Sequence, residues 1–196
     1  MTALNKRACG PCNACCVELK IDVSELRKKA RVPCQHLTAS GCGIYAKRPA
    51  VCQQFLCGWR LFEELDDDWR PDRSGVMVMR KAPAELPARW RGAPYGVHLV
   101  VIGGEAAVLR PAFADTVARQ LARGIPVQMS AASPYILLNE HLDKDSDPAF
   151  LKARLVELYG LLHAARFGQS LGQRMVFLYR LQIDRQRQKF ALKSNS

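Results

Sequence analysis

Eight cysteines lie within 49 consecutive positions near the N-terminus, and this clustering constrains the fold more than any other feature of the 196-residue chain. They are Cys9, Cys12, Cys15, Cys16, Cys34, Cys42, Cys52 and Cys57, and the 139 residues that follow contain none. Unpaired core cysteines would not explain this density. The distribution predicts a cysteine-cluster metal-binding module over residues 1–62 and a second domain over residues 63–196.

Disulfide bonds are the first alternative for so many thiols. The opening residues have a short basic start but no apolar segment of the kind that directs export. Later apolar runs, such as residues 97–102, are far too short to span a bilayer. We therefore expect a cytoplasmic protein without a membrane partner. The cytosol keeps thiols reduced, which favours metal ligation over a disulfide framework.

The spacing of the first cysteines has a chemical reason. In a C-x-x-C turn the two sulfurs converge on one ion, and backbone amides inside the turn hydrogen-bond the thiolates. Eight thiols suffice for two closed four-thiolate zinc sites. Cys15 and Cys16 are adjacent and point in different directions, so they either divide between two sites or bridge a cluster.

An iron-sulfur cluster is the competing cofactor. The run Cys9-x2-Cys12-x2-Cys15 matches the start of the bacterial ferredoxin pattern, in which three close cysteines and one remote cysteine hold a cubane. The Cys-Pro end of that pattern is missing, so the fourth ligand would come from the later cysteines. A wholly cysteine-ligated site favours a structural or electron-transfer role over Lewis-acid catalysis. His36, two residues after Cys34, is a substitute ligand candidate.

The cysteine pattern resembles the bacterial CxxCxxCC, or YkgJ-like, family. The residues that carry this resemblance are Cys9-Gly-Pro-Cys12-Asn-Ala-Cys15-Cys16, Cys34-Gln-His-Leu, Cys42-Gly-Ile-Tyr-Ala-Lys-Arg-Pro and Cys52-Gln-Gln-Phe-Leu-Cys57. They cover about the first 60 residues. The family often has Gly where this chain has Asn13, a departure expected to change the turn slightly. The resemblance implies chelation of zinc or iron by these cysteines.

Charge is distributed unevenly along the chain. Ten Lys and Arg against three Asp and Glu give residues 1–62 a charge of +7, residues 63–147 carry −3, and residues 148–196 carry +7. Two dianionic four-thiolate sites would lower the first value to about +3, so these cations serve as partners of the thiolates. The alternative is that the basic ends bind nucleic acid or an acidic protein. Arg48 is a candidate donor to a thiolate or an anion.

The second domain reads as α+β, a small antiparallel sheet with packed helices. We expect strands over 75–81 and 97–102, the latter continuing through Gly103-Gly104 into a hairpin strand over 105–109. Helices are predicted over 112–123, 148–167 and 171–189, with short strands over 125–129 and 135–138. In the first module, residues 24–31 predict a short helix before Pro33, with the run Asp22-Val-Ser-Glu-Leu as its capping signal.

These observations favour a metal-binding protein. The alternatives are an enzyme or enzyme accessory, acting in protein-lysine methylation as one branch of the resembled family does or in electron transfer, and a nucleic-acid-binding module. No glycine-rich adenosylmethionine loop, nucleophile elbow or paired-carboxylate pattern occurs in residues 60–196. His98 is expected to be a core or boundary histidine.

Overall fold

The computed structural model describes residues 7–131, 135–144, 146–168 and 170–194. It divides into two compact units, Met1–Met79 and Arg80–Ser196. The division falls 17 residues beyond the boundary that the last cysteine suggested, because residues 63–79 belong to the first unit. The first unit therefore contains all eight cysteines and the segment that follows them.

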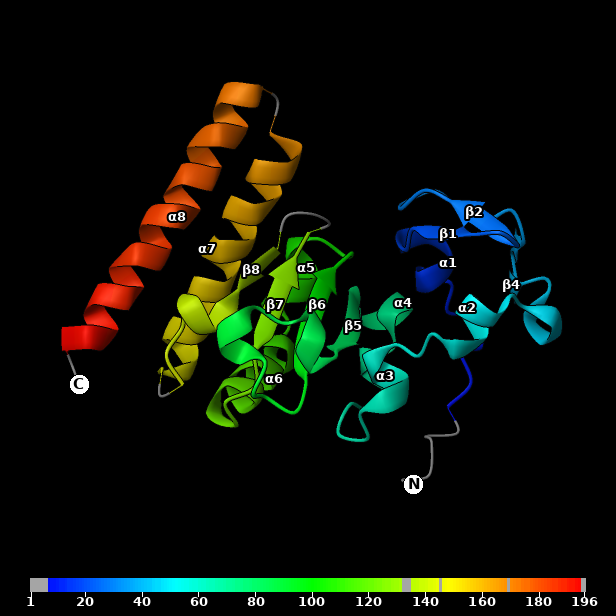
Figure 1. Ribbon diagram of the computed structural model, residues 1–196, viewed down its shortest axis with the longest axis horizontal. Helices are drawn as coiled ribbons and strands as arrows, with labels where there is room; N and C mark the ends of the chain where they lie inside the picture. The colour runs from blue at the N-terminus through cyan, green and yellow to red at the C-terminus, as the bar shows by residue number, and fades with distance from the viewer. Residues whose placement is uncertain (1–6, 132–134, 145, 169, 195–196) are drawn as a thin grey trace. The chain divides into compact units, whose positions relative to one another are not determined.

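The first unit consists of short elements joined by tight turns, coloured blue to cyan-green in Figure 1. Its strands form two separate two-stranded antiparallel sheets. In chain order the elements are α1 (Ala14–Glu18), β1 (Ile21–Val23), β2 (Leu26–Lys28), β3 (Leu37–Thr38), β4 (Gly41–Cys42), η1 (Tyr45–Lys47), α2 (Ala50–Gln54), α3 (Gly58–Leu61), η2 (Asp67–Trp69) and α4 (Pro71–Ser74).

The predicted helix after Asp22 is wrong. Residues 21–28 form the β1–β2 hairpin instead, with Ile21 opposite Lys28 and Val23 opposite Leu26. Ser24 bonds to the carboxylate of Glu25 within the turn and does not cap a helix. The alternation that buries Leu26 and Lys28 on one face is a strand pattern, and it prevails over the local capping signal.

The second unit is built around a four-stranded sheet with the strand order β5-β6-β7-β8. The strands are β5 (Val76–Lys81), which crosses the division between the units, β6 (Gly96–Val101), β7 (Val127–Ser130) and β8 (Tyr135–Leu137). The helical elements are η3 (Pro83–Glu85), η4 (Ala88–Trp90), α5 (Glu105–Leu109), α6 (Pro111–Ala122), η5 (Leu138–Glu140), α7 (Pro148–Phe167) and α8 (Leu171–Ser194).

The predicted hairpin across Gly103-Gly104 is wrong in its second strand. Residues 105–109 form α5, and β6 pairs in parallel with β7, with Val97 opposite Val127. Parallel neighbours need a crossover connection, and α5 with α6 supplies it. Strands β7 and β8 pair antiparallel, so the sheet is mixed and the α+β class is confirmed at that coarser level.

The three long helices of the second unit, α6, α7 and α8, follow the sequence prediction. Pro111 opens α6, and α7 buries the predicted stripe of Leu151, Leu155, Leu158, Leu162 and Ala165. Helices α7 and α8 run side by side as a helical hairpin (Figure 1). Within the described ranges, every helix falls short of the length and apolarity that crossing a bilayer requires.

Candidate metal centre

All eight cysteines belong to the first unit, and all are free thiols. The first four come from one turn and the helix after it. The amide of Cys12 bonds to the carbonyl of Cys9 at 3.1 Å, which closes the turn, and Gly10 has a φ of 56° that favours glycine. Cys15 and Cys16 then lie in α1. Asn13 precedes α1 with a negative φ of −119°, a conformation open to any residue.

The other four cysteines are each placed by a different element. The amide of Cys34 bonds to the carbonyl of Cys16 at 2.9 Å, which ties the loop after β2 to α1. Cys42 lies in β4 opposite Leu37. Cys52 lies in α2, and Cys57 is the residue directly before α3. Short-range turns and long-range hydrogen bonds thus bring distant thiols into one unit.

Four thiols form a first group, here called set A, made up of Cys9, Cys12, Cys15 and Cys57. All four line a void of about 30 Å³, which Cys52 lines as well. Burial raises the pKa of Cys12, and the charge of Cys57 raises it further. Burial likewise raises the pKa of Cys57, with a further contribution from Cys9. These mutual effects show that the members of set A lie within electrostatic reach of one another.

The other four thiols form set B, made up of Cys16, Cys34, Cys42 and Cys52. All of them line a cavity of about 430 Å³. The pKa of Cys52 is raised by burial and then by the charges of Cys16, Cys34 and Cys42, its three partners in the set. The charge effects thus group the eight cysteines four and four, although Cys15 is affected more by Cys16 of set B than by Cys9 and Cys12 of set A.

The Cys15–Cys16 pair connects the two sets. A hydrogen bond between the two side chains raises the pKa of Cys15, and burial raises it further. The same hydrogen bond lowers the pKa of Cys16 to about 6, and the charges of Lys28 and Arg48 lower it as well. Cys15 is therefore the thiol donor, and the Cys16 sulfur carries the negative charge.

Lys28 is a buried cation beside set B. Its side chain is 9% exposed, and its ammonium group donates to the carbonyl oxygens of Val17 (3.0 Å), Lys29 (3.1 Å) and Leu19. Two of these carbonyls lie at the C-terminal end of α1, where a cation is favoured. A buried ammonium normally has an anionic partner, and Cys16 is the anionic side chain whose pKa it affects.

Arg48 and Arg60 add a positive charge near each set. Arg48 donates to the carbonyl of Tyr45 at 2.9 Å and stacks 3.7 Å from the centre of that ring, and its charge lowers the pKa of both Cys16 and Cys52. Both proposed roles of Arg48, shaping a turn and facing a thiolate, are thus compatible with its position. The charge of Arg60 lowers the pKa of Cys57.

Backbone N–H groups face two thiols of set A. Acting as donors, the amides of Ala14 and Asp72 lower the pKa of Cys12, and the amides of Trp59 and Arg60 lower the pKa of Cys57, in opposition to burial. Such bonds favour the ionised thiolate. They are the kind of donors expected around a metal-bound sulfur.

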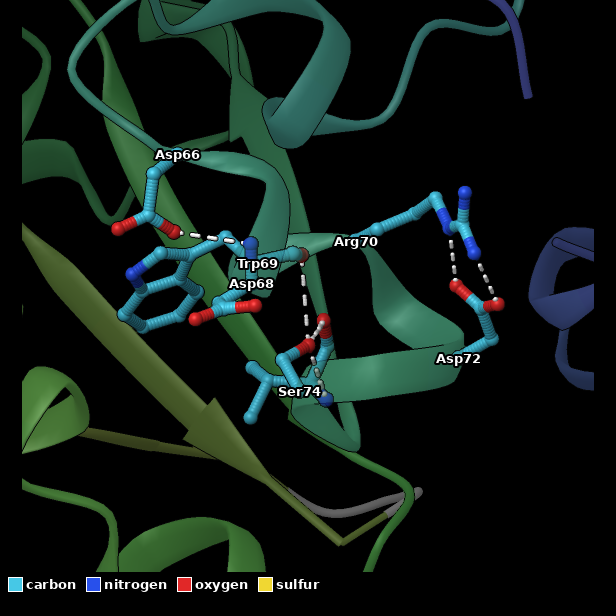
Figure 2. Close-up of polar contacts among 7 residues, drawn as sticks. Asp66, Asp68, Trp69, Arg70, Asp72 and Ser74 are labelled. Atoms are coloured by element: carbon cyan, nitrogen blue, oxygen red, sulfur yellow. Dashed lines mark hydrogen bonds and ion pairs between the residues drawn. The ribbon is translucent and has the colours of Figure 1, made fainter. Parts of the chain in front are cut away.

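The segment that positions Asp72 is shown in Figure 2. Asp72 forms a two-point ion pair with Arg70, at 2.7 Å and 2.9 Å, and this pair lowers the pKa of the carboxyl group. The buried hydroxyl of Ser74 bonds to the carbonyl of Trp69 and accepts from the amide of Val76. These bonds fix α4, so that Asp72 lies beside set A, where its carboxylate is paired with Arg70 and its charge still raises the pKa of Cys12.

Among the described residues, no group of three or more His, Cys, Asp or Glu side chains is arranged to hold a metal ion. The two sets are defined by their mutual charge effects alone, because Cys9, Cys12 and Cys15 also line the larger cavity and Cys52 also lines the smaller void. No protein-family model matches the chain. No curated protein or solved structure gives a significant match either.

The remaining predicted site residues divide between the units. His36 lines the large cavity beside set B. In the second unit His98 is partly buried and bonds to the hydroxyl of Ser130 at 2.9 Å, as expected of a boundary histidine. On α8, Arg174 donates to the carbonyl of Gly168, and Met175, Val176 and Tyr179 are exposed. The side chains of Arg185, Arg187 and Lys189 lie outside the described residues.

Sequence reasoning missed the groups that surround the thiols. Lys28 was interpreted only as part of a helix. The backbone amides of Asp72, Trp59 and Arg60 carry no sequence signal, because a backbone N–H group is common to nearly all residue types. The one available signal for Lys28 was its place in an alternating strand, which puts it on the buried face with Leu26.

Proposed function

We propose that the first unit is a metal-binding module in which set A and set B each hold one zinc ion. The observation that supports this most directly is the gathering of all eight thiols in one unit, where their mutual charge effects group them four and four. Four sulfurs are the ligand number of a structural zinc site. The CxxCxxCC resemblance points to the same chemistry.

The chemistry around the sulfurs fits a bound cation. Without a metal ion, members of the same set raise one another's pKa, because ionising one thiol beside a second thiolate places two negative charges together. A divalent ion would remove that repulsion and leave each site with a charge of −2. Lys28 and Arg48 beside set B, and Arg60 beside set A, are cations suited to balance such a charge.

The role that follows is structural. The strands that lie wholly in the first unit have only two or three residues each, too short to be stable alone. A bound metal ion contributes its binding energy to folding, because the unfolded chain offers no preformed site. Iron, or an iron-sulfur cluster held by the same thiols, would instead supply electron transfer.

Elemental analysis with a visible absorption spectrum, on protein purified without oxygen, tests the proposal. We expect two zinc ions per chain and no absorption above 350 nm. Iron with acid-labile sulfide and a brown colour would replace zinc by an iron-sulfur centre and favour the electron-transfer alternative. Protein without zinc or iron, also after reconstitution with either, would refute the proposal.

Set-specific variants test the division of the ligands. Cys9→Ser and Cys57→Ser each remove one ligand of set A, and Cys34→Ser and Cys42→Ser each remove one of set B. We expect every one of these variants to retain about one zinc ion. His36→Ala is the control, because it removes the non-cysteine candidate beside set B and should leave two. Loss of both ions in every cysteine variant would contradict two separate sites.

A further inference from the structure

Helix α8 packs on α7 along one side (Figure 1) and leaves large apolar side chains uncovered on another. They form a row, here called the α8 row, of Leu171 (76% exposed), Met175 (59%), Leu178 (37%) and Tyr179 (66%). These positions recur every three or four residues and so share one face of the helix. Leu181, by contrast, is buried inside the unit. A contiguous exposed apolar row, unlike a single exposed leucine, marks an interaction surface.

The α8 row leads into a groove at the edge of the sheet. Strand β8 is the last strand in the sheet order, and all of its residues, Tyr135–Leu137, line a groove of about 630 Å³. Residues 87–89 and 140–141 line the groove as well, and three residues of α8, Leu178 among them, line its other side. Leu178 thus belongs to both the α8 row and the groove, which makes them one continuous surface of the second unit.

The charge around this surface is positive. The sequence of α8 contains six Lys and Arg against one Asp. Arg180 is exposed directly after Tyr179, the last residue of the α8 row. Among the residues described around the groove, Glu140 is the carboxylate, and it is paired with Arg89. An acidic partner is complementary to this surface, whereas a second copy of the chain would bring two basic helices together.

The shape of the surface distinguishes between acidic partners. A bilayer is flat on this scale and does not fill a groove between a helix and a strand. A nucleic acid would place charged phosphates against the apolar row. A protein helix with apolar side chains at matching spacing covers the row and extends along the groove, as amphipathic helices do in other helix-binding grooves.

We propose that the α8 row and the adjoining groove bind an amphipathic helix of an acidic partner protein. The apolar face of that helix covers Leu171, Met175 and Tyr179, and its carboxylates lie against the basic residues of α8. Burial of the apolar row supplies the affinity, and the opposite charges supply specificity and fast association. The surface lies within the second unit, so this inference is separate from the proposed metal binding.

The test measures binding of two synthetic peptides to the full-length protein by fluorescence polarisation. The first peptide has leucine at helical spacing with glutamate and alanine elsewhere, over about five helical turns. The second peptide has lysine in place of every glutamate. We expect the glutamate peptide to bind about tenfold more tightly than the lysine peptide, or better. Equal affinities, or no binding of either peptide, would overturn the proposal.

Variants locate the binding surface. Met175→Asp in the α8 row and Tyr135→Asp in the groove should each weaken binding of the glutamate peptide about tenfold, because each places a carboxylate on an apolar contact. Phe150→Asp is the matched control, since Phe150 is 53% exposed on α7 and lies outside the groove lining. The same loss in all three variants would mean that net charge alone governs binding, which would contradict a defined surface.

Two further measurements on the same proteins address the other occupants. Sedimentation equilibrium without peptide should give a monomer. A dimer that Met175→Asp dissociates would assign the α8 row to a second copy instead. Co-sedimentation with vesicles containing phosphatidylserine should show no binding that depends on Met175. Vesicle binding that Met175→Asp abolishes would assign the row to a membrane and overturn the proposal.

Discussion

At the residue scale, Lys28 links the cysteine chemistry to the backbone. Its ammonium group is buried, donates to three carbonyl oxygens and lies near the Cys16 sulfur. A single side chain therefore holds the end of α1 and offsets the negative charge of set B. Exposed surface lysines rarely have either role.

Lys28→Met should destabilise the protein by about 2 kcal/mol, because partly buried carbonyl groups lose their donor. Urea denaturation of the zinc-loaded protein measures this loss. Lys29→Met is the control, since Lys29 is exposed on the neighbouring position. Equal losses in the two variants would show that the buried contacts of Lys28 do not matter.

His98 gives the second unit a pH dependence. Burial lowers its pKa from 6.5 to about 4, with a smaller contribution from the charge of Lys81. The folded state therefore binds fewer protons than the unfolded state between these pH values. We expect the free energy of unfolding to fall as the pH drops from 6.5 to 4, by up to about 3 kcal/mol.

The measurement for His98 is denaturation across this pH range, compared with His98→Gln, which still has a donor for Ser130 but does not titrate. The variant should lose most of the slope that His98 causes. His163→Gln, on an exposed position of α7, should keep the wild-type slope. If His98→Gln also keeps that slope, His98 is not its source.

At the element scale, the long helices and the four strands of the second unit were predictable, whereas α5 and the β1–β2 hairpin were not. Pro111 and Pro148 open α6 and α7 with apolar stripes at helical spacing, and both predictions are confirmed. Residues 105–109 follow Gly103-Gly104 with a short apolar run, which predicted a hairpin strand. The parallel pairing of β6 with β7 instead requires a crossover connection, and these residues form a helix within it. Pairing partners are a tertiary property, which one segment does not reveal.

Candidate thiols were equally predictable, but their grouping was not. The spacing identifies all eight cysteines, whereas the division into sets depends on which elements fold against α1. The position of α3 brings Cys57 within electrostatic reach of Cys9 and Cys12, and no local sequence pattern indicates this. The hairpin of β1 and β2, which places Lys28 beside Cys16, was read as a helix for the same reason.

Helix α3 is held close to β5 by Gly58. A Cβ atom at this position would lie 2.7 Å from the Cβ of Val78 and 3.0 Å from Cδ2 of Phe62. Gly58→Ala should therefore destabilise the first unit by about 2 kcal/mol and weaken zinc binding at Cys57, the residue before it. Thermal unfolding and zinc content measure the two effects.

Gly160 provides the matched control for this variant. It lies on an exposed position inside α7, and an added Cβ meets nothing within 4 Å. Gly160→Ala should stabilise the protein by about 1 kcal/mol, because alanine has the higher helix propensity. Destabilisation by both substitutions would mean that close packing is not the cause at Gly58.

At the scale of the whole molecule, the two units depend on different sources of stability. The first unit has short strands and clustered thiols, whereas the second has a four-stranded sheet and the long helices α6, α7 and α8. Metal removal should therefore affect the units unequally. With a chelator such as EDTA, we expect hydrogen exchange to rise throughout residues 7–79.

Peptides from β6, β7 and α6 provide the internal comparison in the same mass-spectrometric experiment. These elements bury Leu99, Val117 and Met129 completely and contain no cysteine. Their exchange should stay within twofold of the value without chelator. A matching rise in both units would indicate that they unfold together.

The ligands of the two sets are nested along the chain. Cys15 and Cys57 of set A enclose the whole span from Cys16 to Cys52 that supplies set B. A polypeptide leaving the ribosome therefore presents every ligand of set B before the last ligand of set A. If the sets bind metal as proposed, set B fills first during synthesis. Its ion then shortens the loop that Cys57 must close, which lowers the entropic cost of completing set A.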